Sequence, residues 1–250
     1  MGGFFFLYIC LMASVNSVYK TLKDVVNKDQ QGFITPDTFN NFASVAQLRI
    51  YNRLFDNLKD AQRNVKAGFD RGRDKGLVKR IQEDLSVFSK TSNTITRESS
   101  GVFNKPSDLS RIISIYSSGD IIMSSSSRKP MEICYDEEKI ERILVSNISA
   151  PTEQFPVALV SNVIEVFPES IMNIKMRYYK TPNTPSFEYN VVGGLEVYDS
   201  LNSVDFDLPD HYEDQLVVEI AELAGVALRE QYLNQISSGE QTQKQREQAF

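Results

Sequence analysis

Apolar residues recur every three or four positions in the N-terminal third of the chain, the spacing that an amphipathic helix places on one face. Thr35-Pro36 opens the most regular stretch, with Thr35 as the expected N-cap and Pro36 at the first helical position, where a missing N–H costs nothing. A charged, glycine-punctuated connection over residues 68–76 is expected to follow it. The predicted helices cover residues 14–28, 36–65 and 77–88.

From about residue 102 the pattern changes to short apolar runs separated by turn residues and prolines, which is typical of strands. The clearest alternation of apolar and polar side chains lies in Ile171–Tyr179. Three consecutive carboxylates from Asp136 are expected to open a short helix, because they favour the positive end of a helix dipole. The Ser/Thr-rich residues 89–101 are predicted to be a loop. The predicted strands cover residues 109–116, 121–123, 157–160, 163–167, 171–179 and 204–208.

A final helical pattern begins at Leu208 and continues to Tyr232. The order of helices, strands with one helix, and a last helix predicts an α+β fold. In this fold the N- and C-terminal helices pack together, and an antiparallel β-rich region is inserted between them. We expect a helical core over residues 14–100 and 205–236, the β-rich insertion over residues 101–204, and a flexible tail over residues 237–250.

Residues 1–13 form an apolar N-terminal segment, whose apolar run is roughly half the length that a membrane-spanning helix requires. Three interpretations stay open for it. The reading frame is over-extended and translation starts at Met12, or the segment is buried or docks on a partner, or it is the core of a signal peptide. The last is disfavoured because no Lys or Arg precedes the run and no small-residue cleavage site follows it.

The composition is that of an ordinary globular protein, with 41% hydrophobic residues and a net charge of −6. Two cysteines, Cys10 and Cys134, are too few for a disulfide framework or a zinc cluster, which suits assembly in a reducing cytoplasm. Residues 1–100 carry 15 Lys and Arg against 10 Asp and Glu, whereas residues 101–250 carry 12 against 23. The acidic balance disfavours direct nucleic-acid binding. Two solvated surfaces explain the asymmetry, and so does docking of complementary faces.

No group of residues builds a convincing active site. Residues 27–38 copy the spacing of a calcium loop, but Thr38 stands where the closing bidentate Glu should be. The single histidine, His211, has no Ser or Cys motif beside it, and Gly193-Gly194 lacks the context of a phosphate loop. We therefore predict a protein that is not an enzyme and that binds no cofactor and no metal.

Two segments of the chain carry a resemblance to a known family. The segment from Ser14 to Phe55, with its phrase VNKDQQGFITPDTFNNFASVAQ, resembles the opening of a family of virion structural proteins from podovirus-like phages, notably the crAss-like phages. Leu208-Pro-Asp-His-Tyr212, which runs into an Ile/Ala/Leu-rich helix with Gly225, resembles the closing helix of that family.

The resemblance implies a head–tail connector, a ring-forming subunit between portal and tail at the head–tail junction of the virion, assembled in the host cytoplasm. Its expected partners are further copies of itself in a ring that is commonly twelvefold, the portal protein, and tail or ring proteins. Genomic DNA would pass through without specific binding, and no membrane is involved. Another virion part such as the tail tube, and an exported bacterial surface or adhesion protein, stay open as alternatives.

We expect interface residues on the long helices, in the sheet and in the acidic C-terminal half, where carboxylates would line a channel wall and repel phosphate. The candidates are Phe39, Phe42, Arg49, Arg53, Tyr178, Tyr179, Asp205, Asp207, Tyr232 and Phe250.

Overall fold

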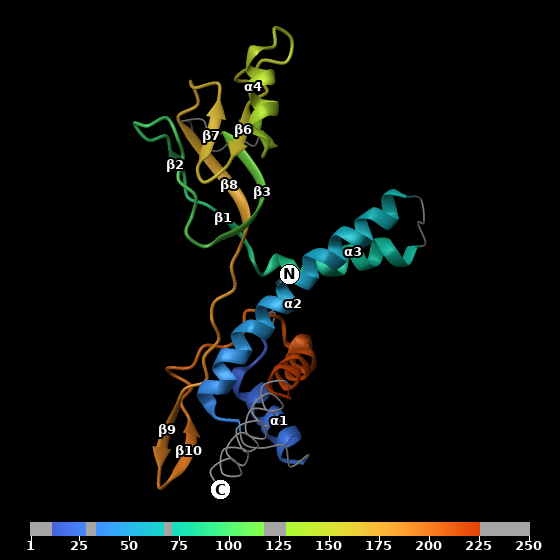
Figure 1. Ribbon diagram of the computed structural model, residues 1–250, viewed down its shortest axis with the longest axis vertical. Coiled ribbons are helices and arrows are strands. Elements are labelled where there is room, and N and C mark those ends of the chain that lie inside the picture. The colour runs from blue at the N-terminus through green and yellow to red at the C-terminus, as the bar shows by residue number, and fades with distance from the viewer. Residues whose placement is uncertain (1–11, 29–33, 68–71, 118–128, 226–250) are drawn as a thin grey trace, which may run out of the picture. The chain divides into compact units, whose positions relative to one another are not determined.

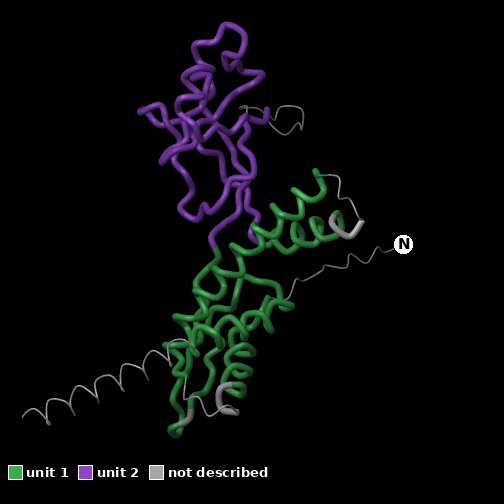
Figure 2. The backbone as a smooth tube through the Cα atoms, turned by 45° about the vertical axis from the view of Figure 1, so that its right-hand side comes forward, with its two compact units in different colours: residues 1–87, 182–250 green, residues 88–181 purple. Residues whose placement is uncertain are grey.

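The computed structural model describes residues 12–28, 34–67, 72–117 and 129–225 of the 250-residue chain. The chain divides into two compact units (Figure 2). Unit 1 comprises residues 1–87 and 182–250, and unit 2 comprises residues 88–181. Unit 2 is therefore an insertion into unit 1, with boundaries that lie before the expected 101 and 204.

Unit 1 is built mainly from helices (Figure 1). Thr35 caps the longest of them as predicted, because its Oγ1 accepts the N–H of Thr38 at 3.3 Å, and Pro36 is the first helical residue. The predicted helices over residues 14–28 and 36–65 are confirmed. The helices in the described part of the unit are α1 (Val15–Lys28), α2 (Pro36–Lys66), α3 (Gly72–Ser86), a 3₁₀ turn (Asp210–Tyr212) and a C-terminal helix described over residues 213–225.

Helix α3 begins inside the segment that was expected to be a connection. Gly72 and Gly76 lie in its first turns, although a glycine in a helix costs about 1 kcal/mol relative to alanine. Ile81 and Leu85 are buried further along the helix, and this burial offsets the low propensity of the glycines. The prediction of a connection as far as residue 76 is therefore wrong.

The N- and C-terminal helical regions pack together, as predicted. Leu216 and Ile220 of the C-terminal helix are completely buried. At its start, Glu213 accepts the backbone N–H of Ser14 at 2.8 Å, so the first residues before α1 are tied to the last helix. Together with the sheets of unit 2, this packing confirms an α+β fold.

Polar side chains of α2 hold the irregular chain that returns from unit 2. Gln47 is 1% exposed, donates from Nε2 to the Asn183 carbonyl at 2.6 Å, and accepts the N–H of Asp207 at 2.9 Å. About two helical turns earlier in α2, the side chain of Asn40 forms two hydrogen bonds with the backbone of Phe187, at 3.2 and 2.7 Å. The side-chain amides of Gln47 and Asn40 thus satisfy backbone groups of this returning segment that would otherwise need a neighbouring strand.

The expected strand over residues 204–208 is not a strand. Val204 forms an isolated bridge with Ser186, and Pro209 forms another with Met12. Because side chains from α2 already satisfy the neighbouring backbone, this extended segment has no continuous ladder.

A β-hairpin that was not predicted from the sequence belongs to unit 1. Strands β9 (Tyr189–Val192) and β10 (Leu195–Tyr198) pair in antiparallel register, with Leu195 opposite Val192. Gly193 and Gly194 form the two-residue turn, with φ of 62° and 83°. Positive φ at both turn positions is what a type I′ hairpin requires, and glycine reaches it without strain.

An aromatic cluster anchors the base of this hairpin. The Phe187 ring lies 4.3 Å from that of Tyr19 and 5.3 Å from that of Tyr198, between ring centroids. Burial, followed by the nearby charge of Glu196, raises the pKa of Tyr19 to about 12.

The described residues of unit 2 form two sheets. Strand β8 is the centre of the larger one: β1 and then β2 pair along one edge, and β3 pairs along the other. Ser89 of β1 lies opposite Tyr179 of β8, so the two ends of the insertion are neighbours. The larger sheet consists of β1 (Ser89–Thr91), β2 (Ile95–Thr96), β3 (Leu109–Ser117), β4 (Lys129–Pro130) and β8 (Asn173–Lys180), and the smaller one of β5 (Glu132–Cys134), β6 (Val157–Val160) and β7 (Ile164–Phe167).

The central strand of the smaller sheet is buried on both faces. Ala158 and Val160 of β6 belong to the main core of unit 2, whereas Val157 and Leu159 pack with Ile140 of α4. Helix α4 (Glu137–Val145), which connects β5 to β6, is the short helix predicted to open at the carboxylates from Asp136. Asp136 is also its N-cap, since its side chain accepts the N–H groups of Glu138 and Lys139. Strands β5 and β6 run parallel, unlike the other pairs, because a helical crossover returns the chain in the same direction.

The Ser/Thr-rich segment predicted to be a loop contributes β1 and β2 instead. All three residues of β1 are exposed, so the strand has no apolar alternation that a sequence could reveal. Backbone pairing with the edge of β8 stabilises it, and β-branched Thr91 and Ile95 favour extended backbone.

Candidate interaction surfaces

The expected interface residues of α2 divide into buried and exposed side chains. Phe39 is completely buried, with its ring centroid 4.9 Å from that of Tyr19, so the prediction of an interface role is wrong for it. Phe42 is half-buried. Arg49 and Arg53 keep exposed side chains on the surface of unit 1.

Both arginines converge on one carboxylate of the C-terminal helix. Glu219 pairs with Arg53 and with Arg49, the latter at 3.7 Å between Oε2 and Nη1. Only 10% of the Glu219 side chain is exposed, so its charge is compensated by two cations that are themselves half in water. The arginines therefore hold the two helical regions together.

Tyr178 is an interior residue and not an interface residue. It is 2% exposed, and its hydroxyl donates to Asp108 Oδ1 at 2.8 Å, while Lys90 Nζ lies 2.6 Å from Oδ2 of the same carboxylate. The hydrogen bonds from Lys90 and Tyr178 hold the pKa of Asp108 below its usual range, and burial raises the pKa of Tyr178. The neighbouring Tyr179 is half-buried, and burial raises its pKa too.

The two carboxylates expected on a channel wall serve the fold of unit 1. Asp205 Oδ1 accepts the N–H of Val15 at 2.8 Å at the start of α1, and Asp207 Oδ2 accepts that of Asn183 at 2.8 Å. These carboxylates were predicted to repel DNA phosphate from a channel wall. Their hydrogen bonds to the backbone show that both side chains also have a structural role. The remaining candidates, Tyr232 and Phe250, lie outside the described residues.

The charge asymmetry of the sequence is compensated within unit 1. Residues 1–87 carry 13 Lys and Arg against 9 Asp and Glu, whereas residues 182–250 carry 3 against 13. Both segments belong to the same unit, where Arg49 and Arg53 meet Glu219, and Lys23 meets Glu196 at 3.5 Å. Part of the asymmetry thus needs no partner.

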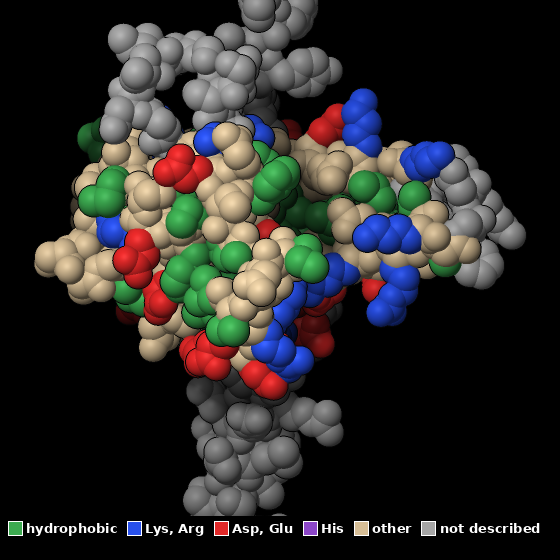
Figure 3. Space-filling model, turned by 90° about the horizontal axis from the view of Figure 1, so that it is seen from above, with side chains coloured by type: hydrophobic (Ala, Val, Ile, Leu, Met, Phe, Trp, Pro, Cys, Tyr) green, Lys and Arg blue, Asp and Glu red, His purple; other side chains and the backbone are tan. Residues whose placement is uncertain are grey.

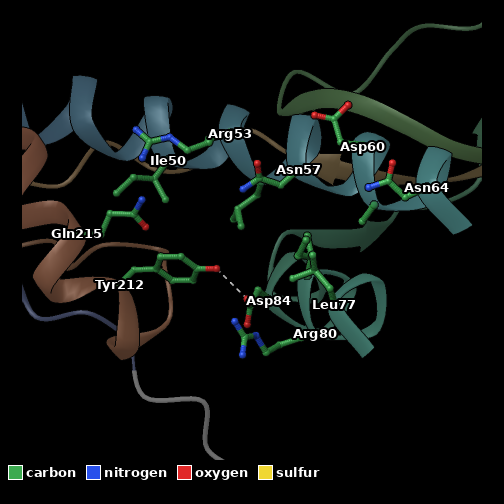
Figure 4. Close-up of a pocket in the computed structure, with 13 residues that line it drawn as sticks. Ile50, Arg53, Asn57, Asp60, Asn64, Leu77, Arg80, Asp84, Tyr212 and Gln215 are labelled. Atoms are coloured by element: carbon green, nitrogen blue, oxygen red, sulfur yellow. Dashed lines mark hydrogen bonds between the residues drawn. The ribbon is translucent and has the colours of Figure 1, made fainter. Parts of the chain in front are cut away.

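A cleft of about 410 Å³ lies between α2, α3 and the 3₁₀ turn of unit 1 (Figure 4). Apolar side chains line it from two helices: Ile50, Leu54 and Ala61 from α2, and Leu77 and Ile81 from α3. Among them Leu77 is the one with an exposed side chain. We name this site the α2–α3 cleft.

Tyr212 and Asp84 close one side of the cleft. The Tyr212 hydroxyl points across from the 3₁₀ turn and donates to Asp84 Oδ2 at 2.8 Å (Figure 4). Burial, and then the hydrogen bond to Asp84, raise the pKa of Tyr212 well above its ordinary value. His211 Nε2 lies 3.5 Å from the other oxygen of Asp84. This arrangement fastens α3 to the start of the C-terminal helix, and no described nucleophile accompanies it.

Large apolar side chains stand exposed on two further elements. In the β9–β10 hairpin, Val192 and Val197 lie on the same face and are both exposed. In unit 2, the α4–β6 loop (residues 146–156) follows Val145, which is 84% exposed, and contains Ile148 and Phe155, which are 97% and 80% exposed. Figure 3 shows hydrophobic side chains exposed at the surface near the middle of the view, with acidic side chains beside them.

Neither the α4–β6 loop nor the cleft was predicted from the sequence. Apolar residues between Ser146 and Pro156 follow no helical or strand period, and that lack of period in an apolar segment was the available signal. The cleft arises from three segments that are distant in sequence, so no local pattern marks it.

Two further observations concern the described part of the chain. It holds no group of three or more His, Cys, Asp or Glu side chains placed to bind a metal ion. None of its helices combines the length and the apolar character needed to cross a membrane.

No protein-family model matches the sequence. No curated protein matches it either.

Proposed function

We propose that this chain is a structural subunit of a tailed-phage virion, a ring-forming connector that links the portal to the tail and continues the DNA channel. The observation that carries the proposal is the exposure of Val145 at the end of α4 and of Ile148 and Phe155 in the α4–β6 loop, which are 84%, 97% and 80% exposed. Several large apolar side chains exposed close together in sequence are typical of a contact that forms on assembly. The resemblance of Ser14–Phe55 to virion structural proteins is the reason for proposing a phage connector as the assembly in which this contact forms.

The expected partners are further copies of the chain in a ring, the portal protein, and tail or ring proteins. DNA would pass through the ring without specific binding. Residues 182–250, with 3 Lys and Arg against 13 Asp and Glu, are a poor surface for phosphate. In this proposal the exposed carboxylates of Asp210 and Asp214 are the appropriate positions for testing a repulsive channel wall, since Asp205 and Asp207 also stabilise the fold.

The experiment is a mass measurement of the purified chain across a concentration series, alone and mixed with the portal protein of the same phage. A closed oligomer, or a complex whose mass fits a ring on the portal, supports the proposal. A chain that stays monomeric at every concentration and beside portal contradicts it. Electron microscopy of the mixture gives the symmetry of the ring.

A further inference from the structure

The larger sheet of unit 2 has one buried face and one face toward solvent, with β8 at its centre (Figure 1). Ile115 of β3 and Ile174 and Met176 of β8 are completely buried in the core of the unit. Because successive side chains of a strand point to opposite faces, Lys175 and Arg177 of β8 project from the other face. Lys175 is half-buried there, and Arg177 is exposed.

Cross-strand pairing places the side chains of this solvent face in rows across β8. The central row joins Thr91 of β1, Arg177 of β8 and Ser114 of β3. The rows on either side add a cation and a tyrosine each. The paired residues of those rows are Lys175 with Tyr116, and Tyr179 with Arg111. We name the surface that these three rows form the β8 basic face.

A hollow of about 440 Å³ opens on the β8 basic face. Its lining contains the whole central row, together with Tyr116 and Pro130. Strand β3 is irregular beside it, because the register of β3 on β8 shifts between Ile112 and Ser114. Such irregularities redirect side chains next to binding sites. The hollow lies in the size range of ligand sites, and it combines a guanidinium, two hydroxyl groups and an aromatic ring.

Charge in unit 2 is segregated along the chain. Residues 88–131 and 170–181, which supply the larger sheet, carry 9 Lys and Arg against 3 Asp and Glu, whereas residues 132–169 carry 2 against 8. The three rows contain no carboxylate, and no carboxylate in the described part of the chain forms an ion pair with Lys175 or Arg177. Glu132, on the strand that follows β4, pairs with Lys139 at 3.0 Å. This face is therefore positive although the whole chain is acidic.

Cations that alternate with aromatic rings on an open sheet match the chemistry of single-stranded nucleic acid. Lys and Arg neutralise phosphates whatever the sequence, and aromatic rings stack on unpaired bases. Tyr116 and Tyr179 are half-buried, so part of each side chain stays accessible. A duplex keeps its bases stacked on one another, and an acidic peptide would use the cations but not the rings.

We propose that the β8 basic face binds single-stranded nucleic acid without sequence preference, with Arg177 on a phosphate and Tyr116 against a base. The carboxylates that make the chain acidic are concentrated in residues 182–250 of unit 1, so they do not neutralise this face. The proposal is independent of the connector function, and it adds a second kind of contact to unit 2.

The test is fluorescence anisotropy of the full chain with a labelled oligothymidylate of about 12 nucleotides, a length that a single-strand site can cover. The slope of log K against log salt should be about −2 for three phosphate contacts on a single strand. Arg177→Ala and Lys175→Ala should each weaken binding about tenfold at low salt and make the slope shallower by about 0.7.

Two further variants separate charge from stacking. Arg142→Ala is the matched control, because it removes the same charge from α4, where the Arg142 side chain is 72% exposed, and should leave affinity unchanged. Tyr116→Leu should weaken binding about fivefold or more while the salt slope stays the same, since it removes a ring but no charge. Tyr179→Leu repeats this test on the second ring. Circular dichroism and melting of every variant check that the fold is retained.

Four outcomes would overturn the proposal. The first is no binding at low salt, and the second is an equal loss in Arg142→Ala and Arg177→Ala, which would reflect net charge alone. The third is a duplex of the same length that binds as tightly as the single strand. The fourth is a glutamate-rich peptide that displaces the labelled strand better than unlabelled oligothymidylate does, because the face would then dock a protein segment. None of these results bears on ring formation with portal.

Discussion

The two units hold their irregular backbone in different ways. In unit 1 the neutral amide of Gln47 serves one carbonyl and one N–H. In unit 2 the guanidinium of Arg97 donates to three carbonyls, those of Ile171, Gly101 and Val166, at 3.1, 2.9 and 2.6 Å. In each unit, one side chain thus forms hydrogen bonds with backbone groups that are not paired in a β-sheet.

The difference lies in charge and exposure. Gln47 is buried and uncharged, so it loses little by leaving water. Arg97 is half-buried, and its guanidinium also lies 5.2 Å from the centroid of the Phe103 ring. Its charged N–H groups form stronger hydrogen bonds, and its fork orients them toward several loops at once. A charged group can therefore organise more backbone, provided that solvent still reaches it.

The largest expected effect follows from removal of this fork. Arg97→Ala leaves three carbonyls without their donor and should destabilise unit 2 by about 3 kcal/mol or more. Hydrogen exchange resolved by peptide is the appropriate measurement, because it reports each unit separately. Peptides of β8 should exchange faster, and those of α2 should not change.

Arg97→Lys sharpens the comparison. It keeps the charge but not the fork, so exchange in unit 2 should lie between wild type and Arg97→Ala. Equal protection in Arg97→Lys and wild type would mean that charge alone suffices.

The corresponding change in unit 1 is expected to have a smaller effect. Gln47→Leu keeps the volume but leaves the Asn183 carbonyl and the Asp207 N–H unsatisfied, which should cost about 2 kcal/mol. Exchange should rise in unit 1 alone. Leu48→Ala, at an exposed neighbour on the same helix, is the control, and a similar loss there would contradict the argument.

A third change removes one hydrogen bond within unit 2. Tyr178→Phe deletes the donor to Asp108 but keeps the buried ring, so unit 2 should lose about 1 kcal/mol in denaturant unfolding. The pKa of Asp108 should rise at the same time, because one of the groups that lower it is gone. An unchanged Asp108 titration, followed by NMR, would show that Lys90 alone sets it.

The smallest expected effect is a dependence on pH. The folded pKa of Asp108 is depressed below an unfolded value of about 3.9, so its contribution is present above that value and is lost as pH falls through the folded pKa. Between neutral pH and about pH 3, the wild type should lose more protection in unit 2 than Asp108→Asn. Equal losses in the two proteins would assign the acid sensitivity of the unit to other carboxylates.

Much of the fold follows from periodicity and capping. Helix α1 was predicted from its apolar stripe alone. Helices α2 and α4 were predicted from an apolar stripe together with the cap at Thr35 and the carboxylates that begin at Asp136. Strand β8 was predicted because buried Ile174 and Met176 alternate with polar residues.

The remainder depends on partners distant in sequence. Strands β1 and β2 owe their extended form to the edge of β8, and Gln47 looks like a polar helix position until its tertiary partners are known. The candidate sites were predicted least well. Arg49 and Arg53 were predicted to be interface residues; their side chains are exposed and pair with Glu219, and the interface role stays a prediction. Phe39 and Tyr178 were predicted to be interface residues too but are buried, because an aromatic residue has the same sequence pattern in a core and at an interface.

The ends of unit 2 have a consequence for engineering. Ser89 and Tyr179 are cross-strand partners, and the Lys180 N–H donates to the Phe88 carbonyl at 2.8 Å. Since the chain departs and comes back at adjacent points, a tight turn could replace residues 88–181 without stretching the helical scaffold. Unit 2 is in this sense an exchangeable insertion: it can be redesigned, or replaced by another domain, while unit 1 keeps its own core.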